Sequence, residues 1–439
     1  MKKVLIVANL FHASPRIPAL AKYLPEFGWE PTILTVPIKK DPKINLLFPS
    51  GFEEKTRIIE VRYQGDIFWF WRRLLIKMGL REDKSLLNQV KASFGITSKK
   101  SFLDYIFKLY TTIFGYPDEE KNWKTPLLRA ADTLLSNEKF DIIFSSSSPV
   151  IAHIVAKDLK RKYHLPWLAD FRDLWTQNND YPYPFWRKKI EERLEVKTLA
   201  DSDALITVSN PLVRKLEKLH KDKKVYNVMN SFDPEKVNNL SSPLTPEFTI
   251  TYTGQLFVGS RDPEKLLIAL KGLIEEKKIK EEDLKVRFYG PENVWLENKI
   301  KELLLSKVVK QYGKIPREDA LKRQRESQVL LLLNWKGEKS EGVYTGKLFE
   351  YLAAKRPILA TEGSKKDNVI NELLEKTRAG IYGKDIKDIK ELIFKFYSEY
   401  KKKGEIEYQG DWAEISKYNH REMAKQFTQI FNQYSLAEK

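Results

Sequence analysis

The chain has 439 residues, of which 77 are Lys or Arg and 60 are Asp or Glu, so its formal net charge is +17. A single hydrophobic core stops growing at about 250 to 300 residues, and the length therefore predicts two domains. With 42% hydrophobic and 31% charged residues, the composition excludes a disordered chain. The sequence contains no cysteine, which excludes a disulfide framework, a thiolate zinc site and a cysteine nucleophile.

The apolar run at the N-terminus, residues 4–8, is too short for a signal peptide or a membrane span. The longest apolar stretch, 67–80, is interrupted by Arg72, Arg73 and Lys77. We therefore expect a cytoplasmic protein.

Short apolar runs alternate with longer amphipathic segments in the first half of the chain, a pattern typical of a parallel sheet with helices on both faces. In chain order we expect strand 3–8, helix 17–27, strand 30–36, strand 140–145, helix 151–163, strand 167–170, helix 188–199 and strand 204–208.

A polar stretch at 238–246 interrupts this alternation, and we place a domain boundary there, between an N-terminal domain at 1–235 and a C-terminal domain at 236–410. The second half is expected to contain strand 248–252, helix 263–274, strand 285–289, strand 329–334, helix 347–354 and strand 357–361. A last helix is predicted within 411–439, because Met423, Phe427 and Phe431 recur at i, i+4 and i+8. The fold class is α/β, with two doubly wound Rossmann-like domains that face a cleft.

The segment 341–354 carries the sharpest local signal, because it lies between two expected strands. Gly342 and Gly346 allow the backbone to approach a ligand, and the helix that begins near Gly346 offers unpaired N–H groups to an anion. Lys347 adds a positive charge there, and Glu350, one turn later, can accept hydrogen bonds from a ribose diol. The spacing differs from that of a P-loop. An ordinary amphipathic helix with these two charges on its solvent side would show the same pattern.

A second signal is the segment 252–263, in which a strand runs into a glycine-containing loop and then a helix. Arg261 precedes Asp262 and Pro263, the expected N-cap and first residue of that helix. A guanidinium at this place can clamp a diphosphate bidentately. A solvated surface arginine is the alternative interpretation.

These segments, taken in order, resemble the retaining family 4 glycosyltransferases of GT-B fold over nearly the whole chain. The resemblance rests on residues 3–10 with the following 14–16 loop, 147–149, 169–175, 206–209, 230–233, 253–261 and 341–354. It implies a C-terminal domain that binds a nucleotide sugar, an N-terminal domain that binds the acceptor, and a last helix that returns to the N-terminal domain.

The resemblance also implies roles for single residues. Glu350 is similar to the family's ribose-binding glutamate, Lys347 and the 344–346 backbone to its diphosphate contacts, and Arg261 stands in the place of a phosphate-binding lysine. The implied donor contacts are Gly254, Gln255, Gly290, Glu341, Gly342, Tyr344, Thr345, Gly346 and Glu350.

Two positions depart from the family pattern. The first glutamate of its motif would fall on Gly342, so Glu341 is one residue out of register. The family's arginine after the strand glycine is Gln255 here, which leaves more of the phosphate charge to Arg261.

On the N-terminal side, Asp170-Phe171-Arg172-Asp173 stands where many members carry a His-Asp pair. Arg261, Lys347, Arg172 and Asp173 are thus the implied catalytic residues. The implied acceptor contacts are His12, Arg16, Ser148 and Asp170. The alternative for the charged segment is an internal Asp-Arg ion pair that braces the loop, since unpaired buried charge is costly.

Residues 61–110 hold ten basic and four acidic side chains, a local charge of +6 within an insertion that we place at 61–125. Within it, segment 67–81 predicts a helix with Trp and Phe on one face and basic residues on the other. Such a helix suits an anionic membrane surface at the inner face, where a lipid-linked glycan acceptor would lie. Packing of the same face on the N-terminal domain is the alternative.

The leading hypothesis is therefore transfer of a sugar from a UDP- or GDP-sugar to a hydroxyl acceptor with retention, with no metal and no further cofactor. The five histidines show no metal-ligand spacing. A nucleic-acid-binding protein is a rival that the basic charge suggests, but no nucleic-acid motif appears and we expect no such partner. A sugar-nucleotide epimerase or an inactive scaffold of the same fold is the third interpretation.

Overall fold

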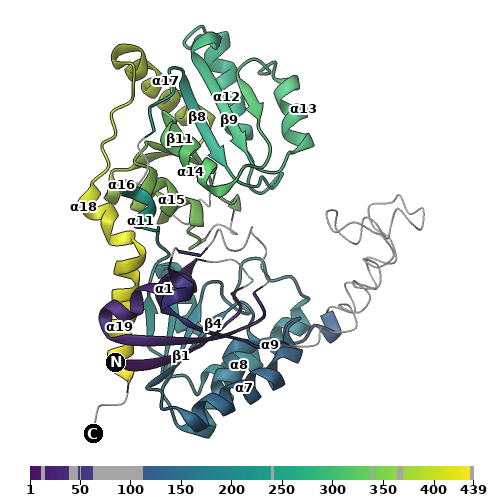
Figure 1. The fold of residues 1–439 in the computed structure, drawn as a ribbon. Helices are drawn as coiled ribbons and strands as arrows, with labels where there is room; N and C mark the ends of the chain where they lie inside the picture. The colour runs from purple at the N-terminus through teal and green to yellow at the C-terminus, as the bar shows by residue number, and fades with distance from the viewer. Residues whose placement is uncertain are drawn as a thin grey trace, which may run out of the picture. The chain divides into compact units, whose positions relative to one another are not determined.

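The computed structural model describes residues 1–10, 15–38, 48–49, 51–62, 112–238, 242–337, 341–362 and 369–435. It divides into two compact units (Figure 1). Unit 1 comprises Met1–Thr207, Leu212–Asn227 and the chain from Phe427, and unit 2 comprises Val208–Pro211 and Val228–Gln426. The predicted contact His12, the helix 67–81 and most of the insertion 61–125 lie outside the described residues.

Unit 1 is built on a seven-stranded sheet in the order β3-β2-β1-β4-β5-β6-β7, in which every neighbouring pair is parallel. In that order its strands are β3 (Arg57–Glu60), β2 (Trp29–Thr35), β1 (Lys2–Ala8), β4 (Ile142–Ser147), β5 (Trp167–Phe171), β6 (Ala204–Thr207) and β7 (Val225–Asn227). The central strands β4 and β5 are buried at every position, as expected of parallel strands covered on both faces.

The helices of unit 1 are α1 (Arg16–Tyr23), α3 (Phe52–Lys55), α7 (Lys124–Asn137), α8 (Ile151–Tyr163), α9 (Phe185–Leu199) and α10 (Asn210–Leu219), the last of which has its first two residues in unit 2. Two short 3-10 turns, Leu24–Phe27 and Lys121–Trp123, complete them. Helix α8 contacts both α7 and α9, and the three lie together in Figure 1. Phe427 and Phe431 pack edge-on against Phe144 of β4.

Unit 2 is built on a six-stranded parallel sheet in the order β10-β9-β8-β11-β12-β13. Its strands are β10 (Val309–Gln311), β9 (Leu284–Tyr289), β8 (Phe248–Thr253), β11 (Val329–Leu333), β12 (Ile358–Thr361) and β13 (Gly380–Gly383). Its helices are α11 (Glu235–Asn238), α12 (Glu264–Glu275), α13 (Val294–Glu302), α14 (Arg317–Arg325), α15 (Gly346–Ala354), α16 (Val369–Thr377), α17 (Ile386–Lys403) and α18 (Trp412–Ile415), with 3-10 turns at Glu281–Asp283 and Ser416–Tyr418. The last helix, α19 (His420–Tyr434), supplies residues to both units.

In each sheet, the order in which the chain adds strands reverses beside the first strand. This point of reversal lies between β1 and β4 in unit 1 and between β8 and β11 in unit 2. The predicted α/β class with two Rossmann-like sheets is thus confirmed. In such sheets ligands bind outside the carboxyl ends of the strands at the point of reversal. Among the described residues, no helix combines the length and the apolar character needed to cross a membrane.

Candidate active site

The residue that follows the carboxyl end of β8 in unit 2 stands at a position that only glycine can occupy. Gly254 follows the strand directly with φ of +141°, and its N–H donates to the carbonyl of Tyr289, 2.6 Å away. Gly290, directly after β9, is equally constrained, because a Cβ there would overlap the Gly254 carbonyl. The two predicted donor contacts Gly254 and Gly290 are therefore neighbours that bring bare backbone to the point where the sheet reverses.

The Lys347 side chain lies against Gly254. A Cβ on Gly254 would overlap the end of the Lys347 side chain, and the Lys347 Nζ lies 5.7 Å from the centre of the Tyr252 ring. One turn later on α15, the Tyr351 hydroxyl accepts a hydrogen bond from the Thr253 N–H at 3.2 Å. Tyr351 thus ties α15 to the end of β8 and sets the position of Lys347.

Arg261 is held in the loop between β8 and α12. Its guanidinium packs over the rings of Phe257 and Trp335, at 4.8 and 4.7 Å from their centres, and donates to the Gln255 carbonyl at 3.2 Å. The side chain is 9% exposed, and its Nε has no hydrogen-bond partner. The neighbouring Asp262 is neutralised elsewhere, by Lys336 at 3.0 Å.

Arg261 and Lys347 form an electropositive pair. Burial and the nearby Arg261 charge lower the pKa of Lys347 to about 8, and Glu350 opposes this shift. Neither cation forms an ion pair in the part of the chain that the structure describes. Since the N-terminal amides of α15 add positive potential at the same place, the arrangement is suited to receive an anion.

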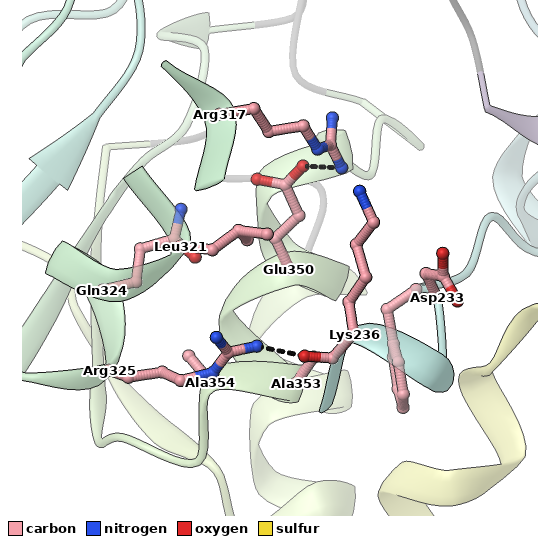
Figure 2. Close-up of a pocket in the computed structure, with 10 residues that line it drawn as sticks. Asp233, Lys236, Arg317, Leu321, Gln324, Arg325, Glu350, Ala353 and Ala354 are labelled. Atoms are coloured by element: carbon pink, nitrogen blue, oxygen red, sulfur yellow. Dashed lines mark hydrogen bonds and ion pairs between the residues drawn. The ribbon is translucent and has the colours of Figure 1, made fainter. Parts of the chain in front are cut away.

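Glu350 lies one turn further along α15, where its carboxylate pairs with the Arg317 guanidinium of α14 at 2.7 Å. Both side chains are about one quarter exposed, at 27% and 25%. Figure 2 shows the two pointing toward each other beside a narrow pocket of about 20 Å³ that Lys236 also lines. Glu350 is therefore both accessible and already oriented.

The remaining predicted donor contacts surround this pair of helices. Gln255 is exposed directly after Gly254, and Gly342 adopts φ of +73° in the loop before α15. Thr345 is the N-cap of α15, but its hydroxyl is buried without a partner. Glu341, Tyr344 and Gly346 lie in the same segment, half-buried or exposed.

In unit 1, the predicted acceptor contacts Arg16 and Asp170 bind each other. The Arg16 Nη2 lies 2.8 Å from Asp170 Oδ1, and the two residues are 2% and 0% exposed. Ser146 donates a further hydrogen bond to Asp170 at 2.7 Å, and Phe427 stacks on the guanidinium. These two charges contact each other rather than solvent, so their effect on a ligand can only be indirect.

Arg172 braces the loop that follows β4. Its Nε donates to the Ser147 carbonyl at 2.9 Å, and its Nη2 donates to the Ser148 carbonyl at 2.6 Å. Ser148 and Asp173 are both exposed. The structure thus brings Arg172 and Ser148 together, and it leaves the Asp173 carboxylate at the surface of unit 1.

Sequence reasoning missed the side chains that hold the site. Arg317 and Trp335 belong to no recognised motif, and Tyr351 lies in the segment 341–354 but has no predicted role there. The three side chains orient Glu350, Arg261 and α15 respectively. Only the aromatic residue at Tyr351, four positions after Lys347, gave a signal, because i and i+4 share a helix face.

Three solved structures illustrate what the whole chain is similar to. A sucrose-phosphate synthase from Thermosynechococcus elongatus has a TM-score of 0.63 at 12% identity, with 99% of both chains covered. HepE from Anabaena in complex with UDP has a TM-score of 0.61 at 11% identity, covering 99% of this chain and all of the other. A protein from Listeria monocytogenes titled as a putative UDP-N-acetylglucosamine 2-epimerase has a TM-score of 0.55 at 11% identity, covering 98% and 95%.

No protein-family model and no curated protein matches the sequence. The likeness to solved structures establishes the fold, and the chain has the GT-B fold of glycosyltransferases. Within the described ranges, His, Asp and Glu side chains form no group of three that could hold a metal ion.

Proposed function

We propose that this protein is a retaining glycosyltransferase, of the family 4 type, that moves a hexosyl or related sugar from a nucleoside-diphosphate sugar to a hydroxyl acceptor. One observation carries the proposal. Lys347 lies against Gly254, Arg261 is close enough to lower the pKa of Lys347, and neither has an ion-pair partner in the described residues, so the two cations lower the cost of placing a diphosphate there.

The proposed step is a front-face transfer without a metal. The bond between the anomeric carbon and the leaving phosphate oxygen breaks, the acceptor oxygen bonds to that carbon from the same face, and the departing diphosphate takes the acceptor proton. The negative charge that grows on the leaving phosphate is stabilised by Arg261, Lys347 and the amides at Gly346. No paired carboxylates are assigned as nucleophile and acid.

The donor is proposed to bind along α15. The diphosphate would lie at its N-terminus, and Glu350 would accept hydrogen bonds from the ribose hydroxyls. The backbone at Gly290 would frame the base. HepE in complex with UDP and with UDP-glucose supports a uridine nucleotide as the first candidate, with a guanosine nucleotide as the second.

The acceptor is proposed to be a glycan or a lipid-linked glycan. Ser148 and Asp173 are the accessible candidates in unit 1, and His12 remains a candidate outside the described residues. The buried pair Arg16 and Asp170 would support the loops around them. A cytoplasmic protein that contacts the inner face of a membrane through 67–81 stays part of the proposal, and no nucleic acid is expected as a partner.

Nucleotide binding tests the proposal at its centre. A panel of nucleotides is screened by thermal shift, and the best binder is titrated calorimetrically into wild type, Arg261→Gln and Lys347→Met. We expect each substitution to weaken binding by about tenfold to a hundredfold, the range for lost charged hydrogen bonds. Lys301→Met, which removes an exposed lysine of α13, is the matched control and should bind like wild type. Equal affinity in all four proteins would contradict the assignment.

A sugar-nucleotide epimerase is the second candidate, because a protein titled as one shares the fold. The two functions differ in what they need. A transferase releases the free nucleotide in proportion to added acceptor, whereas an epimerase converts the nucleotide sugar with no acceptor present. Conversion of the donor without acceptor would favour the epimerase.

A further inference from the structure

Helix α9 of unit 1 buries three charged side chains and exposes four large apolar ones, unlike an ordinary surface helix. Arg187, Glu191 and Glu195 are at most 1% exposed. In contrast, Phe185 and Trp186 in the first turn are 70% and 50% exposed. Further along the helix, Ile190 and Val196 are 46% and 40% exposed.

The inward polar residues are fully used inside the unit. Arg187 Nε lies 2.6 Å from Glu191, which also accepts a hydrogen bond from the Trp175 indole at 3.1 Å. Glu195 accepts from the backbone N–H of Thr176 at 3.0 Å. These bonds fix the orientation of α9, and the orientation forces its apolar side chains outward. Folding therefore does not account for this exposed apolar surface, which is typical of an interaction site.

The fully exposed charges of α9 are all cationic, and Glu192 of the same helix is half-buried. The exposed residues of α9 are the four apolar side chains together with Lys189, Arg193 and Lys197, and none of them is a carboxylate. Lys189 Nζ lies 4.6 Å from the centre of the Phe185 ring, so the cationic and aromatic groups are interleaved. We call these seven side chains the α9 face.

A second segment extends the α9 face beyond the helix. The Arg187 guanidinium donates to the carbonyls of Thr112 and Gly115, at 2.6 and 2.8 Å. This holds residues 112–115 against the first turn of α9. Ile113 and Phe114 between these anchors are 49% and 52% exposed.

We propose that the α9 face, together with Ile113 and Phe114, docks unit 1 on an anionic lipid surface. Aromatic and aliphatic side chains surrounded by lysine and arginine match the boundary between acyl chains and negatively charged headgroups. A second copy of the chain would present the same cations to each other, which is unfavourable. A nucleic acid would use the cations but not Ile190 or Val196. The inference goes beyond sugar transfer and does not depend on it.

Vesicle sedimentation tests the proposal with the full chain. Phosphatidylcholine vesicles with about 30 mol% phosphatidylglycerol provide the anionic surface, and pure phosphatidylcholine vesicles provide the neutral one. We expect wild type to sediment with the anionic vesicles and to be released by salt. Trp186→Ser with Ile190→Ser should lower the partition coefficient by about tenfold or more, because binding scales with the buried apolar area.

Two further variants separate apolar burial from charge and from general surface effects. Lys189→Gln with Arg193→Gln and Lys197→Gln should lose about fivefold per charge, on the order of a hundredfold in all. Val294→Ser with Leu304→Ser, at side chains that are 78% and 77% exposed in unit 2, is the matched control and should bind as wild type does.

Failure of wild type to bind anionic vesicles overturns the proposal. Retained binding in both α9 variants, with release by Trp71→Glu and Leu75→Glu, assigns the membrane contact to 67–81 and overturns it as well. A dimer in gel filtration that only the α9 variants dissociate makes the α9 face a contact between copies, and this result also overturns a lipid partner. Affinity for UDP, measured on each variant, keeps the outcome separate from that of the proposed transfer reaction.

Discussion

The surroundings of Lys347 disfavour its positive charge when no anion is bound. Its pKa lies at about 8 instead of 10.5 because burial and Arg261 both oppose the proton. Below about pH 8 the charged lysine therefore destabilises the folded state, and this cost disappears as the pH rises toward 10.5. A bound diphosphate should raise the pKa of Lys347, since its negative charge favours the protonated lysine.

The affinity for UDP should consequently depend on pH in a defined direction. We expect it to be constant near pH 7, where Lys347 is protonated with or without ligand, and to fall above about pH 8 by up to tenfold per pH unit. Calorimetric titration at pH 7, 8 and 9 measures this. Lys347→Met should bind more weakly at pH 7 and lose the slope, and a slope that survives in this variant would assign the titration to another group.

Glu350 should discriminate between ribose and its analogue without hydroxyls. Wild type is expected to prefer UDP over 2′,3′-dideoxy-UDP by about tenfold to a hundredfold, the range for hydrogen bonds to a charged group. Glu350→Ala should bind the two nucleotides equally and keep the fold, because its side chain is 27% exposed. Calorimetry on the four combinations gives the coupling energy directly.

Glu318→Ala is the matched control for this cycle. Glu318 is a carboxylate of the neighbouring helix α14, 56% exposed and paired with Lys236 at 3.2 Å. It should keep the preference of wild type for UDP. If Glu350→Ala retains that preference too, the ribose is read by another group.

The charged groups of the proposed site could be found in the sequence, but their supports could not. Lys347 and Glu350 follow from a glycine-rich loop that opens a helix, and Arg261 follows from its place before an N-cap. Arg317 lies 33 positions before Glu350, and no local pattern links them. Arg16 and Asp170 show the reverse case, because their charges suggest a ligand and the structure pairs them with each other.

At the scale of elements, a buried hydroxyl adds a polar tie to the apolar packing of α15. Tyr351 accepts from the Thr253 N–H, and Thr253 in turn accepts from the Gln324 side chain at 2.9 Å. This chain of contacts connects β8, α14 and α15. Tyr351 is 0% exposed, so bulk solvent does not reach this hydroxyl.

Tyr351→Phe should therefore both destabilise the protein and weaken nucleotide binding. We expect a loss of about 1 to 3 kcal/mol, because the Thr253 N–H loses its buried acceptor, and a lower affinity for UDP through displacement of Lys347. Thermal unfolding and calorimetry measure the two effects. Tyr312→Phe, at a residue that is 42% exposed, serves as control. A stable variant with normal affinity would show that α15 is held by its apolar contacts alone.

The types of elements were predictable, whereas several ends and one orientation were not. The expected helix 17–27 continues past Tyr23 only as a 3-10 turn that contains Pro25, which lacks an N–H for the helix. The last helix expected within 411–439 is interrupted at Asn419, whose side chain accepts from the N–H groups of Arg421 and Glu422. Asn419, three residues before Glu422, is a signal for the start of a helix. The prediction relied on the apolar spacing alone and did not use this signal.

Helix α9 shows why orientation is harder to predict than type. Its apolar residues suggest an inward face, but the buried ion pair of Arg187 and Glu191 fixes the opposite face inward. A pattern rule assumes that charge faces water, and this assumption fails where charges satisfy one another inside the protein.

At the scale of the whole molecule, alternation of apolar runs and helices predicts two parallel sheets but not their strand order. The edge strands β3, β7, β10 and β13 are only three or four residues long and carry too little pattern to be recognised. Each sheet nevertheless follows the doubly wound order, so the point of reversal and the site beside it can be located once the central strands are known.

Asp170→Ala should destabilise unit 1. It leaves Arg16 buried and without its partner, an effect of about 3 to 5 kcal/mol. For a unit of about 200 residues this lowers the midpoint of thermal unfolding by on the order of 10 °C. Asp173→Ala, which removes an exposed carboxylate from the loop after the same strand, is the control and should leave the midpoint unchanged.

Nucleotide binding should stabilise unit 2, because every proposed donor contact from Gly254 to Glu350 lies in that unit. UDP at a hundred times its dissociation constant stabilises the form that binds it by about 2.7 kcal/mol. In differential scanning calorimetry of Asp170→Ala, we expect unfolding of unit 1 to move to lower temperature and to separate from that of unit 2. Addition of UDP should then shift only the later transition, by roughly 5 to 10 °C. A shift of the earlier transition instead would place the nucleotide in unit 1, and the roles of Arg261, Lys347 and Glu350 would have to be reassigned.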